Sequence, residues 1–213
     1  MATVLITGAA GYIGSHLADA LVARGDLTIG LDNFDPQYDR SIKERNLEGL
    51  GRSPRFVLVE GDIRDRELLR RIMREYRPDA VVHLAAKAGV RESLEIPLEY
   101  VSVNVEGTLT VLEACVEAGV RKVVFGSSSS VYGPYSRAPF SEDEPVGRPA
   151  SPYAATKVAC EAMCHVYHHL HGLSVVVTRI FNPIGPRQRP GMALDKFTRR
   201  MLAGEPIPIY GDG

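Results

Sequence analysis

A tyrosine and a lysine four positions apart are the residues of this sequence best suited to proton-transfer chemistry. The segment Tyr153-Ala-Ala-Thr-Lys157 follows Ser151-Pro152, a pair typical of a helix start. On a helix the two side chains share one face, and an adjacent ammonium lowers the pKa of a phenol from its ordinary value of ~10. Tyr153 could then serve as a base. The alternative is a surface Tyr-Lys pair, which is common on amphipathic helices.

Hydroxyl groups gather upstream of this helix. The apolar run 123–126 leads into four serines at 127–130, and Val131-Tyr132 follows them. If the run is a strand, it delivers these hydroxyls to the carboxyl edge of a sheet, where a substrate oxygen could lie between a serine and Tyr153. The alternative is a polar loop, but the apolar residues on both sides indicate an ordered turn.

Three glycines at the start of the chain have the spacing of a dinucleotide-binding turn. Gly8, Gly11 and Gly14 follow an apolar run and open a helical segment. Such glycines allow a tight turn and a close approach of backbone to a pyrophosphate at the helix N-terminus. Asp32 closes the next strand, where a carboxylate accepts from ribose hydroxyls and repels a 2′-phosphate, so NAD is favoured over NADP. The glycines could instead form a structural turn, and Asp32 could begin a turn with Asn33.

Two further expected strands end at the same carboxyl edge of the sheet. The third expected strand ends in Gly61-Asp62-Ile63 and the fourth in Leu84-Ala85-Ala86. Small residues let backbone lie against a flat ligand, although tight packing of helix on sheet explains the alanines equally well. Their position, where a nucleotide must cross, favours contact with the ligand.

Strands and helices alternate along the chain. Strands buried on both faces are predicted at 4–7, 27–32, 56–60, 80–86, 122–127 and 174–180, and helices at 14–24, 66–76, 98–118, 152–171 and 192–203. This alternation predicts an α/β fold, a Rossmann-like doubly wound parallel sheet. Residues 133–152 are rich in Pro, Ser and acids, which indicates a surface loop near the site.

The chain's composition favours a small-molecule ligand. Its 213 residues carry 25 basic and 26 acidic side chains with a net charge of −1, which argues against nucleic acid and membrane surfaces as partners. Three cysteines, two of them four apart on an expected helix, indicate buried thiols and a reducing cytoplasm. The N-terminal apolar run is too short for a signal peptide, and no stretch approaches the ~20 apolar residues of a membrane helix, so a soluble protein without a metal site is expected.

The last residues differ in character from the rest. After residue 180 comes a turn-dense stretch, then the expected helix and an apolar, strand-like run ending at Gly213. We expect residues 1–180 to form the NAD-binding domain with the Ser/Tyr/Lys group, and 181–213 to be only the beginning of a C-terminal substrate lobe. A strand-like end without a partner indicates a natural truncation or the boundary of the sequenced piece.

Taken together, these motifs resemble an extended short-chain dehydrogenase/reductase of the NAD-dependent epimerase/dehydratase family. The resemblance spans nearly the whole chain. Segments 83–93, 97–104 and 179–186 look most like those of UDP-glucose and UDP-glucuronate 4-epimerases.

The resemblance implies roles for individual residues. Tyr153 would be the base, Lys157 would orient it and bind the nicotinamide ribose, and Ser128 would bond to the reacting sugar oxygen, with Ser129 and Ser130 in support. Arg91 would pair with a carboxylate or phosphate, although a solvated loop arginine is equally plausible. The other implied positions are the cofactor site of Gly8, Gly11, Tyr12, Ile13, Gly14, Asp32, Asn33, Asp62, Ile63, Leu84, Ala85, Ala86, Asn104 and Ser127, and Asn182 at the phosphates of the sugar nucleotide.

The implied reaction is a 4-epimerisation through a transient 4-keto sugar, on a UDP-hexose or UDP-uronate, with NAD retained between turnovers. Family dehydratases have an Asp-Glu pair where this chain has Ser129-Ser130, so dehydration is disfavoured. Family members also usually continue well past Gly213. Two other hypotheses are therefore a non-catalytic NAD-binding protein and a nucleotide-sugar reductase that releases its cofactor.

The resemblance also implies a homodimer. In the family the helices corresponding to 98–118 and 152–171 commonly pair across the interface. Here they carry Val111, Leu112, Cys115, Met163 and Val166, for which packing inside the chain is the equally good alternative.

Overall fold

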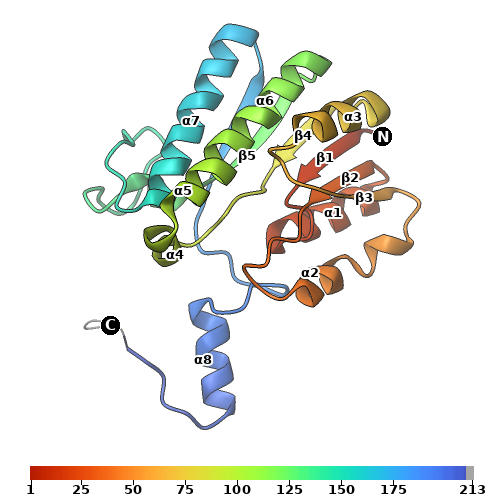
Figure 1. The fold of residues 1–213 in the computed structure, drawn as a ribbon. Coiled ribbons are helices and arrows are strands. Elements are labelled where there is room, and N and C mark those ends of the chain that lie inside the picture. Colours follow the sequence, from red (N-terminus) through yellow and green to blue (C-terminus); the bar gives the residue numbers. More distant parts are fainter. Residues whose placement is uncertain (210–213) are drawn as a thin grey trace.

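A six-stranded parallel sheet forms the centre of the computed structural model, which describes residues 1–209. The strands stand in the order β3-β2-β1-β4-β5-β6, the doubly wound topology (Figure 1). The strand order reverses between β1 and β4, so a crevice opens there at the carboxyl edge. The predicted fold is confirmed. The strand bounds are β1 (Thr3–Thr7), β2 (Leu27–Asp32), β3 (Phe56–Glu60), β4 (Ala80–His83), β5 (Lys122–Ser128) and β6 (Ser174–Ile180).

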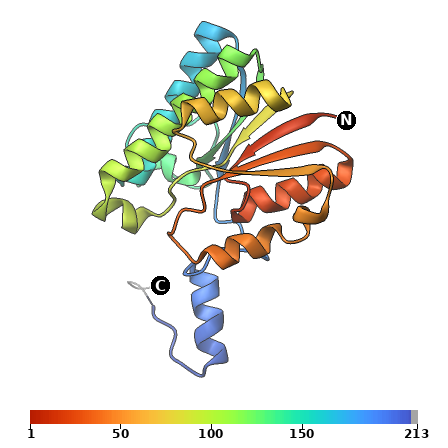
Figure 2. The same cartoon turned by 45° about the vertical axis from the view of Figure 1, so that its right-hand side comes forward.

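Helices cover the two faces of the sheet in separate groups. Helices α3, α6 and α7 lie side by side over one face, and α1 and α2 lie over the other (Figures 1 and 2). None of the helices in residues 1–209 has both the length and the apolar character needed to cross a membrane. The bounds are α1 (Tyr12–Arg24), α2 (Arg40–Leu47), α3 (Arg66–Tyr76), α4 (Val90–Glu95), α5 (Pro97–Tyr100), α6 (Gly107–Ala118), α7 (Pro152–His171) and α8 (Ala193–Leu202), with 3₁₀ turns at Leu50–Arg52 and Ser129–Tyr132.

The core beneath α3, α6 and α7 follows directly from the apolar pattern. Leu69 and Ile72 on α3 are at most 2% exposed and pack with residues of α6, α7 and the central strands. The three cysteines lie in this core as free thiols, as expected. Burial raises the pKa of Cys115 and Cys164 to about 12, so both thiols stay protonated and unreactive.

The structure corrects the expected elements in several places. Strand β4 ends at His83 instead of residue 86, and the expected helix 98–118 is three pieces: α5, a π-helix at Val101–Glu106, and α6. Helices α2 and α4 were not predicted, because both are short and polar. Among the described residues of the C-terminal run, 205–209 form no strand, and residues 210–213 lie outside the described part.

The two edge strands are not buried on both faces as expected. Each has one neighbouring strand, and on each some of the side chains that point to the faces of the sheet remain exposed. Leu58 on β3 is 42% exposed and Val176 on β6 is 57% exposed. Helix α8 projects away from the sheet and has no buried residue (Figure 1).

Candidate active site

The glycine turn after β1 requires glycine for steric reasons. Gly8 has φ +74°, and a methyl group there would lie 2.8 Å from the backbone nitrogen of Ala85. At Gly14 it would lie 2.1 Å from the Gly8 carbonyl oxygen. Gly11 is the N-cap of α1 and offers no capping side chain, so the first amides of the helix face the crevice as anion donors. This geometry suits a pyrophosphate, which is the ligand group that the spacing predicts for these glycines.

Asp32 ends β2 beside this turn, with 7% of its surface exposed. Its Oδ2 accepts from the Ala10 backbone amide and its Oδ1 from the Phe34 amide, both at 2.9 Å. Each oxygen keeps a lone pair for a ligand hydroxyl. The geometry therefore suits a ribose diol at the end of β2.

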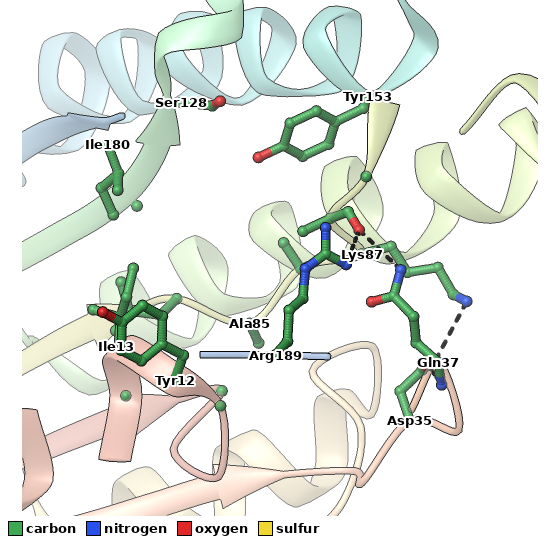
Figure 3. Close-up of a pocket in the computed structure, with 18 of the residues that line it drawn as sticks. Tyr12, Ile13, Asp35, Gln37, Ala85, Lys87, Ser128, Tyr153, Ile180 and Arg189 are labelled. Atoms are coloured by element: carbon green, nitrogen blue, oxygen red, sulfur yellow. Dashed lines mark hydrogen bonds and ion pairs between the residues drawn. The ribbon is translucent and has the colours of Figure 1, made fainter. Parts of the chain in front are cut away.

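One cavity of about 390 Å³ runs along the carboxyl edge of the sheet, from the glycine turn to α7 (Figure 3). It joins the strand ends that carry the expected residues, and its wall includes small residues of the β4 end that leave room for a flat ring. Of the expected site residues, the wall contains Gly8, Gly11, Tyr12, Ile13, Gly14, Asp32, Asn33, Ile63, Leu84, Ala85, Ala86, Ser127, Ser128, Ser129, Tyr153, Lys157 and Asn182.

Helix α7 carries the tyrosine and lysine into this cavity. Ser151 caps the helix by accepting from the Ala154 amide at 3.1 Å, and Pro152 occupies its first turn. The Lys157 ammonium, 4% exposed, donates to the Gly126 carbonyl at 2.7 Å. The Tyr153 ring packs edge-on against Tyr100, with ring centres 6.2 Å apart, and its hydroxyl points into the cavity (Figure 3).

Ser128 lies at the same end of the cavity, at the last residue of β5 (Figure 3). Its hydroxyl oxygen accepts from the Ser130 amide at 3.1 Å, which turns the chain into a 3₁₀ helix. This is the ordered turn that the apolar flanks predicted. Serine, tyrosine and lysine thus meet on one wall, where a hydroxyl of a ligand could contact the first two.

A partly buried ion pair, not foreseen from the sequence, supports this wall. Ser127 donates to Glu161 of α7, and Arg179 of β6 lies 3.0 Å from the same carboxylate. The guanidinium also donates to the Tyr132 hydroxyl at 3.3 Å. The pKa of Arg179 is raised, chiefly by its hydrogen bonds to Glu161. The pair fixes the ends of β5 and β6 to α7.

A neutral histidine lies behind the same wall. His83, 2% exposed, has Nδ1 2.6 Å from the Thr7 hydroxyl and Nε2 3.0 Å from the Thr108 hydroxyl. Burial, and secondarily the Lys157 charge, lower the pKa of His83 to about 3. It is therefore a structural link between β1, β4 and α6.

Comparison with known proteins places this geometry in a family. The NAD-dependent epimerase/dehydratase family model matches residues 4–213. This chain belongs to that family. UDP-glucuronate 4-epimerase 4 of Arabidopsis thaliana is 47% identical over 98% of this chain and 48% of its own length. UDP-glucuronate 4-epimerase of Thermodesulfobacterium geofontis is 43% identical over the whole chain and 66% of its own length. The chain thus spans about half to two thirds of these relatives.

Solved family members have the same fold. UDP-glucuronic acid 4-epimerase from Bacillus cereus, crystallised with UDP-glucuronic acid and NAD, superposes with a TM-score of 0.92 at 39% identity, covering 99% of this chain and 66% of that one. UDP-glucose 4-epimerase from Thermotoga maritima superposes with a TM-score of 0.89 at 35% identity.

Three residues expected at the family's site lie outside the cavity wall. Asn104, on the π-helix and 1% exposed, bonds through its side chain to the backbone of Lys87 at 2.8 and 3.0 Å and to the Thr156 hydroxyl at 2.9 Å. Thr156 in turn donates to the Tyr153 carbonyl. Asn104 therefore positions α7 against the loop after β4.

The other two are Asp62 and Arg91. Hydrogen bonds from Arg64 lower the pKa of Asp62 to about 2, and Asn33 donates to its Oδ2 at 3.0 Å. Asp62 thus holds a wall residue, Asn33, from outside the cavity. Arg91 is exposed on α4 and does not line the cavity.

Three loops meet over the cavity, an arrangement the sequence did not predict. Lys87, 8% exposed at its side chain, lies 3.0 Å from Glu99 and 3.6 Å from Asp35. Gln37 and Arg189 both donate to the Ala88 carbonyl, each at 2.8 Å (Figure 3). The loops after β2, β4 and β6 are thereby tied together. Arg189 also lines the cavity.

In residues 1–209, no group of three or more His, Cys, Asp or Glu side chains gathers as a metal site would require.

Proposed function

We propose that this chain is the NAD-binding and catalytic part of a nucleotide-sugar 4-epimerase. The observation that carries the proposal is a single cavity that begins at the glycine cradle and Asp32 and ends at Ser128, Tyr153 and Lys157. The relatives' names point to UDP-glucuronate or UDP-glucose as the substrate. NAD bound there would accept a hydride from C4 of the sugar and later return it.

The chain's own residues supply proton transfer and positioning. Tyr153 takes the proton of the sugar's 4-hydroxyl, and Lys157, on the same face of α7, places a positive charge at that end of the cavity and would hold the nicotinamide ribose. Ser128 bonds to the same sugar oxygen and keeps it oriented. The 4-keto sugar then turns so that the opposite face of C4 lies toward the cofactor. The hydride would return to that face and Tyr153 returns the proton to the oxygen, so the configuration at C4 is inverted without net oxidation.

We assign the segment after β6 to substrate binding, because residues of this segment line the cavity. Asn182 lines the cavity and we assign it, with Arg189, to the phosphates of the sugar nucleotide. A guanidinium can bond a phosphate in bidentate fashion, and Arg189 suits this role better than Arg91 because it lies in the wall of the cavity. Residues 1–180 are then the cofactor domain and 181–213 the beginning of the substrate lobe.

Dehydration is disfavoured because Ser129 and Ser130, where family dehydratases have Asp and Glu, offer no carboxyl group for removing water. A reductase would release its cofactor after each turnover, whereas an epimerase retains it. A non-catalytic protein would bind NAD and leave the sugar unchanged.

Tyr153→Phe tests the proposal. The purified protein should contain NAD(H), detected by absorbance, and should convert UDP-glucuronate or UDP-glucose to its 4-epimer. The variant should bind NAD equally well and show no turnover, because only the proton-transferring hydroxyl is removed. Undiminished epimerisation by the variant would refute the role of Tyr153.

We also propose a homodimer in a reducing cytoplasm, supported by the free thiols and by exposed apolar side chains on neighbouring helices. Of the five residues considered for the contact, Val111, Leu112 and Cys115 are at most 1% exposed and belong to the core, which is the alternative stated above. Met163 is partly buried against the same core, and Val166 is 40% exposed. Other exposed apolar residues lie on neighbouring helical segments: Leu94 on α4, Leu98 on α5, Val101 at the start of the π-helix and Leu170 on α7.

A further inference from the structure

Lys43 of α2 is a buried cation in the cavity wall. Its side chain is 8% exposed, and its ammonium donates to the Asp35 carbonyl at 3.0 Å. The same nitrogen lies 3.9 Å from Asp32 Oδ1 and 4.9 Å from the centre of the Tyr38 ring. An ammonium has three donors, and within residues 1–209 its hydrogen bond to Asp35 uses one of them. Lys43 therefore has donors left for a ligand in the cavity.

Asp32 does not saturate this cation. Both of its oxygens accept from backbone amides, those of Ala10 and Phe34, and 3.9 Å is a charge contact and too long for a hydrogen bond. A carboxylate with free lone pairs and an ammonium with free donors thus stand side by side. The hydroxyls of a ribose both donate and accept, so a ribose diol matches the two groups together.

The charges of the two groups have a second consequence. While both are present, the buried cation is neutralised by the carboxylate, and a phosphate arriving at the ribose meets a repelling charge. If the carboxylate is lost, Lys43 becomes a buried unpaired cation, a costly state that a phosphate would relieve.

We propose that Lys43 is a specificity-determining residue of the cofactor site: it donates to the adenosine ribose beside Asp32, and it is a latent 2′-phosphate site that Asp32 masks. The inference rests on the proposed function, because it assumes that the adenosine of NAD lies at the end of β2. The preference for NAD over NADP is then a property of the Asp32/Lys43 pair and not of the carboxylate alone.

The test compares binding of NAD and NADP, by calorimetry on protein stripped of nucleotide, across wild type, Lys43→Met, Asp32→Asn and the double variant. Lys43→Met should weaken NAD binding about tenfold, the loss of one charge-assisted hydrogen bond. Asp32→Asn should improve NADP binding about a hundredfold, because the unmasked ammonium then pairs with a charged phosphate; the double variant should lose that gain, so its NADP-to-NAD ratio should lie about tenfold below that of Asp32→Asn. Lys122→Met, at an exposed lysine that begins β5, is the matched control and should change neither constant.

Each result decides the question. If Asp32→Asn and the double variant have the same NADP-to-NAD ratio, Lys43 is not the phosphate partner and the inference is wrong. If Lys43 had a purely structural role, Lys43→Met would weaken the binding of NAD and of NADP by the same factor. An unchanged NADP-to-NAD ratio in that variant would therefore also overturn the inference. If Asp32→Asn does not fold, Lys43→Met alone decides: the preference for NAD should rise, because Asp32 loses its neutralising partner. A wild-type protein that binds neither nucleotide would instead refute the proposed function.

Discussion

Replacing Gly14 with alanine perturbs the tightest contact in the glycine turn. The added methyl group would lie 2.1 Å from the Gly8 carbonyl oxygen, and such contacts are essentially never below 3.0 Å, so the start of α1 must move by about 0.9 Å. Overpacking of this kind costs ~1–3 kcal/mol, offset by about 1 kcal/mol of better helix propensity. We expect a net loss of up to ~2 kcal/mol, which lowers the Tm by up to about 8 °C.

The larger effect should fall on the cofactor. A shift of about 0.9 Å moves the first amides of α1 out of hydrogen-bond distance of a pyrophosphate. We expect NAD affinity to fall at least about tenfold, measured by calorimetry. Gly49→Ala is the control, because a methyl group there meets nothing within 4 Å. NAD binding by the Gly14 variant as tight as that by the Gly49 variant would refute this account of the turn.

Three further outcomes are expected. Glu161→Gln removes the charge that Arg179 pairs with and should cost ~2–3 kcal/mol in urea unfolding, against under about 1 kcal/mol for Glu113→Gln in an exposed pair; equal costs would contradict a supporting role. The folded-state pKa of His83 lies below its ordinary value of 6.5, so the unfolded chain binds the extra proton, and stability should fall as the pH drops from about 6.5 towards 3. Over that pH range the unfolding free energy of His83→Gln should fall less steeply than that of wild type. An identical slope against pH would contradict the assignment. The three buried thiols should react with a thiol reagent only after unfolding, and rapid labelling of the native protein would show that they are accessible.

Residues set by strand ends could be predicted from the sequence. Parallel strands bring all their carboxyl ends to one edge, so finding Gly8, Asp32 and Ser128 at such ends was enough to place them together. The pair Tyr153 and Lys157 required only the helical repeat. These positions depend on local geometry that short stretches of sequence specify.

Contacts between loops could not be predicted. Lys87 meets Asp35, and Arg189 meets Ala88, across long sequence separations that no periodic pattern encodes. Lys43 was missed because the polar α2 helix was not expected. The exposure of Val176 depends on what lies beside β6 and not on the apolar run itself. The division at residue 180 and the roles of individual site residues stay predictions.

The most direct test of the central proposal follows the hydrogen at C4. UDP-glucuronate labelled with deuterium at C4 is incubated with the 213-residue protein, and the product is examined by mass spectrometry and NMR. We predict that the 4-epimer forms with the deuterium still at C4 while NAD remains bound, because the hydride leaves and returns within one site. Replacement of the deuterium by solvent hydrogen, or bound NAD with no epimer formed, would contradict the proposed reaction of this chain.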